Sequence, residues 1–290
     1  MIVKYWGVRG SMPSPGKDTV RYGGNTACVS IEIGDNVVII GAGTGIRAAG
    51  KALVRSDKDI IIMVSHLHYD HVMGFPLFGP LFQSGRVIQL VSYPSPTGPW
   101  TPLKLMDGIH WPITPTELSA DVRIVDDPQA LLAKHGIALT TINVNHPGGA
   151  LGFKIAQGDQ VFVHVPDNEL DQSGEPTLRF DQMVEFCRGA NVLSHDAQYL
   201  DREMPHREGW GHSLAMSTCR LAIQAGVRHL VLFHHDPDRT DDEMDRIGQM
   251  ASDELEPHGI VSTIAYEGLS IDLSNPGSTS LPVIRPHDID

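Results

Sequence analysis

A chain of 290 residues with 41% hydrophobic and 20% charged content can bury one large core and does not have the composition of a disordered protein. Its formal net charge of −13 argues against a long nucleic acid as a partner, because phosphate backbones are bound through clustered Lys and Arg. The amino terminus lacks a signal-peptide pattern, no apolar run is long enough to span a membrane, and the three cysteines form no CxxC, so we expect a cytoplasmic protein.

The first half of the chain is predicted to contain short strands, one helix and an irregular segment. In chain order, we expect strands at 2–8, 27–33 and 36–43, a helix at 45–55, and strands at 59–65 and 86–93. The stretch from about 94 to 130 is rich in proline and carries Trp100 and Trp111. We interpret it as a lid-like insertion, although a surface excursion with two aromatic anchors would give the same pattern.

The second half alternates strands and helices. In chain order, we expect strands at 137–146, 150–158 and 160–167, a helix at 180–189, a strand at 191–199, a helix at 213–226, a strand at 229–235, a helix at 240–255 and a closing β-rich run at 260–273. The tail, 274–290, is expected to wrap along the surface. This order favours a layered α/β sandwich with two sheets inside and helices outside. No linker divides the chain, so residues 1–290 are taken as one domain.

The decapeptide "SHLHYDHVMG" directly follows the apolar run "IIIMV" and holds His66, His68, Asp70 and His71. At an extended strand end, His66 and His68 point the same way because side chains alternate along a strand. Four candidate ligands in one turn exceed what a single tetrahedral site takes from one segment. The pattern therefore favours two adjacent divalent metals, each completed by residues from elsewhere.

Three later segments repeat the order of apolar strand, candidate ligand and turn. "INVNHPGG" offers His146, "VFVHVPDN" offers Asp167, and "LVLFHHDP" offers His234 or His235. A single histidine at a strand end is more often structural. Four such segments in series indicate one shared metal centre.

This ordered set, HxHxDH followed by a histidine, an aspartate and a late histidine, resembles the signature of the metallo-β-lactamase superfamily. The resemblance covers most of the chain and implies a four-layer αβ/βα sandwich, two mixed β-sheets flanked by helices, with the metals at the sheet edges. It also favours His234 over His235. The implied ligand sets are His66, His68 and His146 for one metal, Asp70, His71 and His234 for the other, and Asp167 as the bridge.

Further motifs resemble one branch of this superfamily, the phosphodiesterase-like branch that includes ribonuclease Z and cyclic-nucleotide phosphodiesterases. "YWGVRGSMPSPG" is similar to its opening, and "SHDAQY" with "GHSLAMSTCR" to its acidic–aromatic strand and later His-Ser/Thr element, which implies a catalytic role for His212. Alternatively, Ser213 caps the following helix and His212 only flanks it. The chain departs from the branch at Gly41, usually aspartate, and at Pro166, usually glycine. The arm with which ribonuclease Z holds transfer RNA is not evident.

The favoured function is a hydrolase with two divalent metals, with zinc ahead of manganese or iron because His and carboxylate ligands accept all three. A metal-bridging hydroxide would act on a small phosphodiester or a cyclic nucleotide, with Asp70 and His212 as catalytic residues. The alternatives are a lactone or thioester hydrolase on the same metals and a non-catalytic ligand-sensing protein. A dinucleotide-binding protein is a further alternative, and it depends on a lone G-x-G-x-x-A match at Gly43, Gly45 and Ala48.

The expected partner is a small-molecule substrate, with no membrane involved. Members of the branch are often dimers, so the resemblance leaves a homodimer open. Substrate choice is expected to depend on the 94–130 segment and on the loop "DREMPHREGWG". Trp100, Trp111 and Trp210 could stack on a base or could anchor the core.

Overall fold

The chain folds into two main β-sheets, seen in a computed structural model that describes residues 1–95, 98–274 and 279–280. The larger sheet has eight strands and the smaller has six. The larger sheet contains β1 (Ile2–Gly7), β2 (Cys28–Ile33), β3 (Asn36–Ile40), β4 (Asp59–Met63), β5 (Val87–Val91), β8 (Asp121–Val125), β15 (Ser270–Asp272) and β16 (Thr279–Ser280). The smaller sheet contains β9 (Ala138–Val144), β10 (Ala150–Gln157), β11 (Gln160–Val165), β12 (Val192–Asp196), β13 (His229–Phe233) and β14 (Val261–Ile264).

Both sheets are mixed, and their strand order is β16-β15-β1-β2-β3-β4-β5-β8 and β14-β13-β12-β11-β10-β9. In the larger sheet, β1, β2 and β3 pair antiparallel, whereas β3, β4, β5 and β8 pair parallel. In the smaller sheet, β9, β10 and β11 are antiparallel, and β11 to β14 are parallel. The strands β9, β11, β12 and β13 therefore share a direction, and their carboxyl ends lie at one edge.

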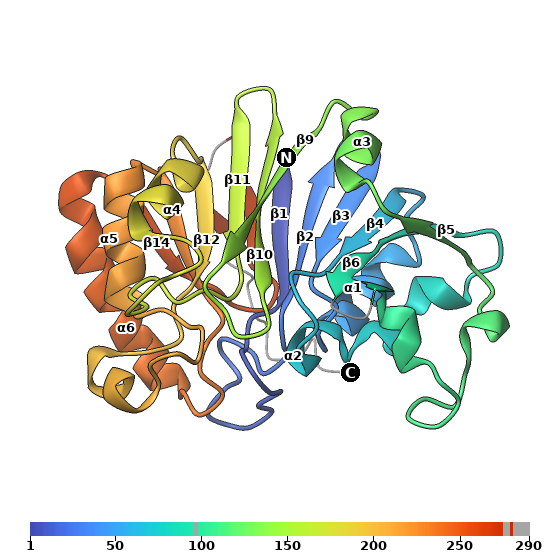
Figure 1. The fold of residues 1–290 in the computed structure, drawn as a ribbon, viewed down its shortest axis with the longest axis horizontal. Helices are drawn as coiled ribbons and strands as arrows, with labels where there is room; N and C mark the ends of the chain where they lie inside the picture. Colours follow the sequence, from blue (N-terminus) through green and yellow to red (C-terminus); the bar gives the residue numbers. More distant parts are fainter. Residues whose placement is uncertain (96–97, 275–278, 281–290) are drawn as a thin grey trace.

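Helices cover the outer faces of the two sheets (Figure 1). The α-helices are α1 (Ile46–Leu53), α2 (Tyr69–Val72), α3 (Pro128–Ala133), α4 (Phe180–Cys187), α5 (Ala215–Ala225) and α6 (Asp241–Leu255). The short 3-10 turns are η1 (Phe75–Leu77), η2 (Gly79–Phe82), η3 (Pro102–Leu105), η4 (Pro115–Glu117), η5 (Asp201–His206) and η6 (Glu256–His258). α4, α5 and α6 pack on the smaller sheet, and α1 packs on the larger one.

Three apolar clusters separate the four layers. The central cluster lies between the sheets, and the other two lie under α1 and under α4 to α6. The alternation of strand side chains sorts residues among these clusters: in β4, Ile61 faces the other sheet, while Ile60 and Ile62 face α1. The predicted four-layer αβ/βα sandwich is confirmed.

The proline-rich segment is more ordered than the sequence predicts. It contains the hairpin of β6 (Tyr93–Ser95) and β7 (Gly98–Trp100), and its last part, Asp121–Val125, is the edge strand β8 of the larger sheet. The strand was missed because it is short, lies next to the proline-rich run, and has mostly exposed side chains at the sheet edge although Val122, Ile124 and Val125 are apolar. Trp100 and Trp111 pack against the α1 cluster, which favours the anchor interpretation.

The predicted extended tail, 274–290, lies outside the described residues except for Ser274 and the short strand β16. Within the residues that the structure describes, no helix has both the length and the apolar character needed to cross a membrane.

Candidate metal centre

The predicted ligand segments meet where the carboxyl ends of the strands converge. The histidine-rich motif follows β4, His146 follows β9, Asp167 follows β11 and His234 follows β13. Because neighbouring parallel strands end at the same edge of a sheet, the residues that directly follow them lie close together at that edge. In Figure 1, α2, which carries part of the histidine-rich motif, lies at the lower centre of the molecule, at the ends of the two sheets.

Three of the predicted ligands form a first cluster, His66, His68 and His146. One ring nitrogen from each lies within 4.8 Å of the others. The Nε2 atom of His146 is 3.0 Å from Nδ1 of His68. The Nε2 atom of His66 is buried and has no hydrogen-bond partner among the described residues. An orphaned buried nitrogen costs free energy unless something binds it, so this cluster fits a metal ion.

The remaining predicted ligands form a second cluster, Asp70, His71, Asp167 and His234, all buried. Nε2 of His71 lies 3.2 Å from Oδ2 of Asp70 and 2.9 Å from Oδ1 of Asp167. Nε2 of His234 lies 3.1 Å from the same Asp70 oxygen. Nitrogen and carboxylate donors that converge in this way fit a second divalent cation.

Asp167 lies between the two clusters. Its Oδ1 is next to His71, while its Oδ2 is 3.4 Å from Nε2 of His234, 3.7 Å from Nε2 of His66 and 3.9 Å from Nε2 of His146. One carboxylate therefore reaches donors of both clusters. This is the geometry that a bridging ligand needs.

Hydrogen bonds to Nδ1 orient three of the histidine rings. The ring of His66 contacts the Ser65 hydroxyl at 3.0 Å, that of His146 donates to the Gly211 carbonyl at 3.0 Å, and that of His234 donates to Oε1 of Gln198 at 2.9 Å. Partners of this kind fix the tautomer and leave Nε2 free for a metal, which makes them part of the site. None of the partners was predicted from the sequence. The three partners are Ser65, Gln198 and Gly211.

His234 and His235 point in different directions. His234 has a φ of 62°, a left-handed backbone that non-glycine residues seldom adopt, and its ring enters the second cluster. His235 instead donates from Nε2 to the Ala265 carbonyl at 2.7 Å. Strained residues of this kind concentrate at functional sites. The geometry therefore favours His234 as the late ligand.

Burial controls the protonation of the first cluster. It lowers the pKa of His66 well below the ordinary value and also lowers the pKa values of His68 and His146. These three imidazoles are therefore neutral near pH 7, as metal ligation requires.

The second cluster favours a positive charge at its centre. Burial opposes ionisation of Asp70 and Asp167, yet neighbouring histidines hold both carboxyl pKa values well below their ordinary range. Burial also opposes charge on His71, but Asp167 and Asp70 outweigh it and raise the pKa of His71. His71 thus holds a proton next to Asp70 and Asp167, and a divalent cation at the same place would satisfy these two carboxylates.

His212 lies beside the two clusters and pairs with Asp196, a residue that the sequence prediction missed. Its Nδ1 donates to Oδ2 of Asp196 at 2.8 Å. Burial opposes the charged imidazole, but Asp196 outweighs it and raises the pKa of His212. Ser213 is not the cap of α5, because its hydroxyl donates to the Asn168 carbonyl and the cap position is Leu214. Asp196 could have been found from its place at the end of the strand in "SHDAQY".

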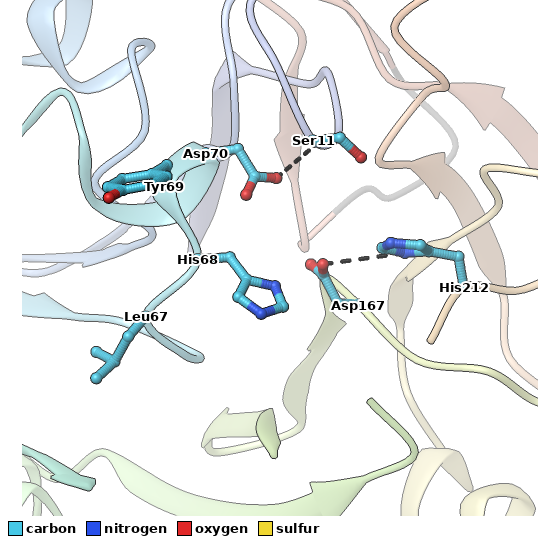
Figure 2. A pocket seen from close by; sticks show the side chains of 7 residues that line it. All are labelled: Ser11, Leu67, His68, Tyr69, Asp70, Asp167 and His212. Carbon is cyan, nitrogen blue, oxygen red and sulfur yellow. Dashed lines mark hydrogen bonds and ion pairs between the residues drawn. The ribbon is translucent and has the colours of Figure 1, made fainter. Parts of the chain in front are cut away.

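A cavity of about 320 Å³ opens over the site. It is lined by His68, Asp70, Asp167 and His212, with Tyr69 on the side opposite His212 (Figure 2). The backbone N–H of Ser11 donates to Oδ2 of Asp70 at 2.8 Å and holds that carboxylate at the cavity wall. Substrate can therefore reach both candidate metal clusters and His212 from one opening.

The dinucleotide alternative finds no support in the backbone geometry. A Cβ atom at Gly43 would lie 2.1 Å from the Asp70 carbonyl oxygen, and one at Gly45 would lie 2.5 Å from the Gly7 nitrogen. These glycines allow close packing of the metal-ligand loop and of β1. Their spacing is explained without a bound dinucleotide.

Comparisons with known proteins identify the family. The sequence profile described as "Beta-lactamase superfamily domain" matches residues 36–235, and the chain therefore belongs to this family. Ribonuclease Z of Thermoplasma acidophilum is 24% identical over 82% of this chain and 87% of its own length. Ribonuclease Z of Halalkalibacterium halodurans is 26% identical over 60% of this chain and 69% of its own length.

Solved structures show the same fold. The metallo-β-lactamase fold protein YhfI of Bacillus subtilis superposes with a TM-score of 0.66 at 17% identity, over 93% of this chain and 98% of that one. Zinc-bound PqqB of Methylobacterium extorquens gives 0.62 at 16% identity, over 94% and 100%. Human tRNase Z, short form, gives 0.59 at 18% identity, over 94% and 99%. The protein is a metal-dependent hydrolase of the metallo-β-lactamase superfamily, and its sequence is similar to ribonuclease Z proteins.

The comparisons correct one prediction. The expectation that the acidic balance argues against a long nucleic acid partner is wrong, because the relatives that match most of the chain are ribonucleases. Formal net charge is a poor guide here since it counts the buried carboxylates of Asp70, Asp167 and Asp196, which lie among histidines and candidate metal positions. Local potential at a site decides nucleic-acid binding, and bound cations would change its sign.

Proposed function

We propose that this protein is a dinuclear metal-dependent phosphodiesterase. The observation that carries the proposal is the division of seven converging side chains into two donor clusters that share one carboxylate, Asp167. His66, His68 and His146 would hold one metal, Asp70, His71 and His234 the other. Zinc is the first candidate, since the donors are imidazoles and carboxylates, and the similarly folded PqqB is zinc-bound.

Two divalent cations held there would lower the pKa of a water molecule between them and polarise a phosphate group. The protein's own residues perform the other steps. Asp70 lines the cavity and can accept a hydrogen bond from the attacking water, which orients it. The loop at Ser11 keeps that carboxylate in place through its backbone N–H.

His212 is proposed as the proton donor. With Nδ1 bonded to Asp196, the opposite ring nitrogen remains for the substrate, and the raised pKa keeps the imidazole protonated more of the time near neutral pH. A protonated imidazole at the cavity wall can stabilise a phosphoryl oxygen or protonate the leaving oxygen. The Asp196 carboxylate holds the ring in the orientation required for this role.

The substrate class is a phosphodiester, either within RNA or in a smaller molecule such as a cyclic nucleotide. The ribonuclease Z relatives support phosphodiester chemistry, and the cavity, open on one side, admits the phosphate of either. The relatives give no support to the lactone or thioester alternative.

The test is a hydrolysis screen with the metal-reconstituted protein. The substrates are bis(p-nitrophenyl) phosphate, 2′,3′-cyclic AMP, an RNA with a 3′ extension, a lactone and a thioester. We expect cleavage of at least one phosphodiester, lost on chelation and restored by zinc or manganese. His212→Ala should lower kcat for a phosphodiester by about 100-fold. Hydrolysis of the lactone or thioester alone would show that the proposal is wrong.

A further inference from the structure

A second cavity adjoins the metal centre. Its volume is about 380 Å³, and its lining includes Tyr69, Met73, Leu105 and Trp111 with Lys104 beside them. Tyr69 also lines the cavity over the metal clusters, so the two spaces share one side chain. A molecule bound at the metals can therefore extend past Tyr69 into the second space.

The backbone of Tyr69 is held in place by its neighbours in sequence. It lies between the candidate ligands His68 and Asp70, and its carbonyl accepts from the Met73 N–H at 2.8 Å. The residue is nevertheless 76% exposed, and its ring extends away from Asp167 (Figure 2). A large aromatic ring that lies at the mouth of a candidate catalytic cavity and is barely used for core packing is typical of a contact for a ligand.

The opposite wall is built from the proline-rich segment. Trp111 and Leu105 pack partly against the α1 cluster, which anchors the wall to the fold. The Asp107 carboxylate accepts from the backbone N–H groups of Ile109 and His110 at 2.9 and 2.7 Å and pairs with Nδ1 of His110 at 2.6 Å. These bonds close the turn at the rim. The second cavity is therefore formed before a ligand binds.

We propose that this second cavity is a subsite for a nucleobase attached to the scissile phosphodiester, with Tyr69 as its specificity-determining residue. The inference rests on the proposed phosphodiesterase function. Tyrosine and tryptophan rings offer flat apolar faces on which any base can stack. The Lys104 ammonium at the same wall suits the polar edge of a base or a flanking phosphate.

The experiment compares two substrates with the same leaving group. Thymidine 5′-(p-nitrophenyl phosphate) carries a base, and methyl p-nitrophenyl phosphate does not. The ratio of their kcat/KM values is measured for the metal-reconstituted parent protein, Tyr69→Ala, Tyr69→Phe and Phe82→Ala. Phe82 is a matched control because it is 40% exposed and lies outside both cavities.

We expect Tyr69→Ala to reduce the ratio about tenfold, as loss of one stacking contact does, while Tyr69→Phe and Phe82→Ala preserve it. An equal ratio in Tyr69→Ala and in the parent protein would overturn the subsite. If neither ester is hydrolysed, calorimetric binding decides the subsite, and the hydrolysis screen decides the phosphodiesterase proposal separately. Thymidine 5′-monophosphate should then bind Tyr69→Ala about tenfold more weakly, with inorganic phosphate unaffected; parallel changes for both would refute the subsite.

Discussion

Glu169 is predicted to hold the loop that positions both His146 and His212. Its side chain is 1% exposed, and its two carboxylate oxygens accept from the Gly209 and Gly211 N–H groups, each at 2.9 Å. The Gly211 carbonyl in turn accepts from Nδ1 of His146. One buried carboxylate is thus connected to a candidate metal ligand through a single residue, Gly211.

Glu169→Gln tests this connection because it keeps the shape of the side chain and removes one acceptor. A backbone N–H would then face an amide NH2 group. Loss of one hydrogen bond to a charged group costs about 1.5–3 kcal/mol, so the free energy of unfolding should fall by that amount. Because the loop also orients His146, the variant's zinc affinity or its kcat/KM should fall about 10–100-fold.

The assay is urea unfolding of the metal-free protein, combined with zinc competition titration and phosphodiester kinetics. Glu208→Gln is the matched control, since this carboxylate is in the same loop, is exposed, and accepts only from the Ser173 hydroxyl among the interactions of the described residues. We expect the control to stay within about 0.5 kcal/mol of the parent protein. If Glu169→Gln matched the control in stability, zinc affinity and kcat/KM, the positioning role would be refuted.

Three further predictions concern the site and the core. Gly211→Ala should weaken zinc binding at least about tenfold in a competition titration, because a Cβ there would lie 2.2 Å from Nδ1 of His146 and the φ of +88° disfavours other residues. Asp196→Asn should lower kcat about 100-fold while elemental analysis shows unchanged metal content, since it removes the charged partner of His212. Burial lowers the pKa of His164 to about 3, so folding excludes a proton that the unfolded chain binds below about pH 6.5. The contribution of His164 to the free energy of unfolding is therefore lost as the pH falls. In urea unfolding, the free energy of unfolding of the parent protein should fall relative to that of His164→Asn by about 1.4 kcal/mol for each pH unit between about pH 6.5 and about pH 3.

Local signals predicted that the candidate ligands would lie close together. His66, His68, Asp70 and His71 share one short segment, so their proximity followed from the sequence itself. The distant ligands followed from a general rule, because the carboxyl ends of parallel strands meet at one edge. The division into two clusters came from the family resemblance, and the geometry agrees with it.

The supporting residues could not be predicted in the same way. Gln198, Gly211 and Glu169 act through hydrogen bonds that join segments far apart in sequence. Their residue types are common in loops, so no local pattern distinguishes them. The edge strand β8 was not predicted for a related reason. Its extended backbone is held by pairing with β5, and its mostly exposed side chains do not indicate this pairing.

The charge argument failed because composition averages over the whole surface. A formal net charge of −13 treats buried and exposed carboxylates alike. Asp70 and Asp167 are buried beside histidines, where bound cations would offset them. Partner class therefore follows from the site and not from the total charge.

The central claim is that two metals share Asp167 and together support phosphodiester cleavage. The most direct test titrates the metal-free protein with zinc while hydrolysis of bis(p-nitrophenyl) phosphate is followed, with bound metal measured by elemental analysis. We predict that activity reaches its plateau at two metal ions per chain, and that Asp167→Ala retains fewer than two and loses activity. Full activity with one metal ion, or activity unaffected by removal of all metal, would contradict the account.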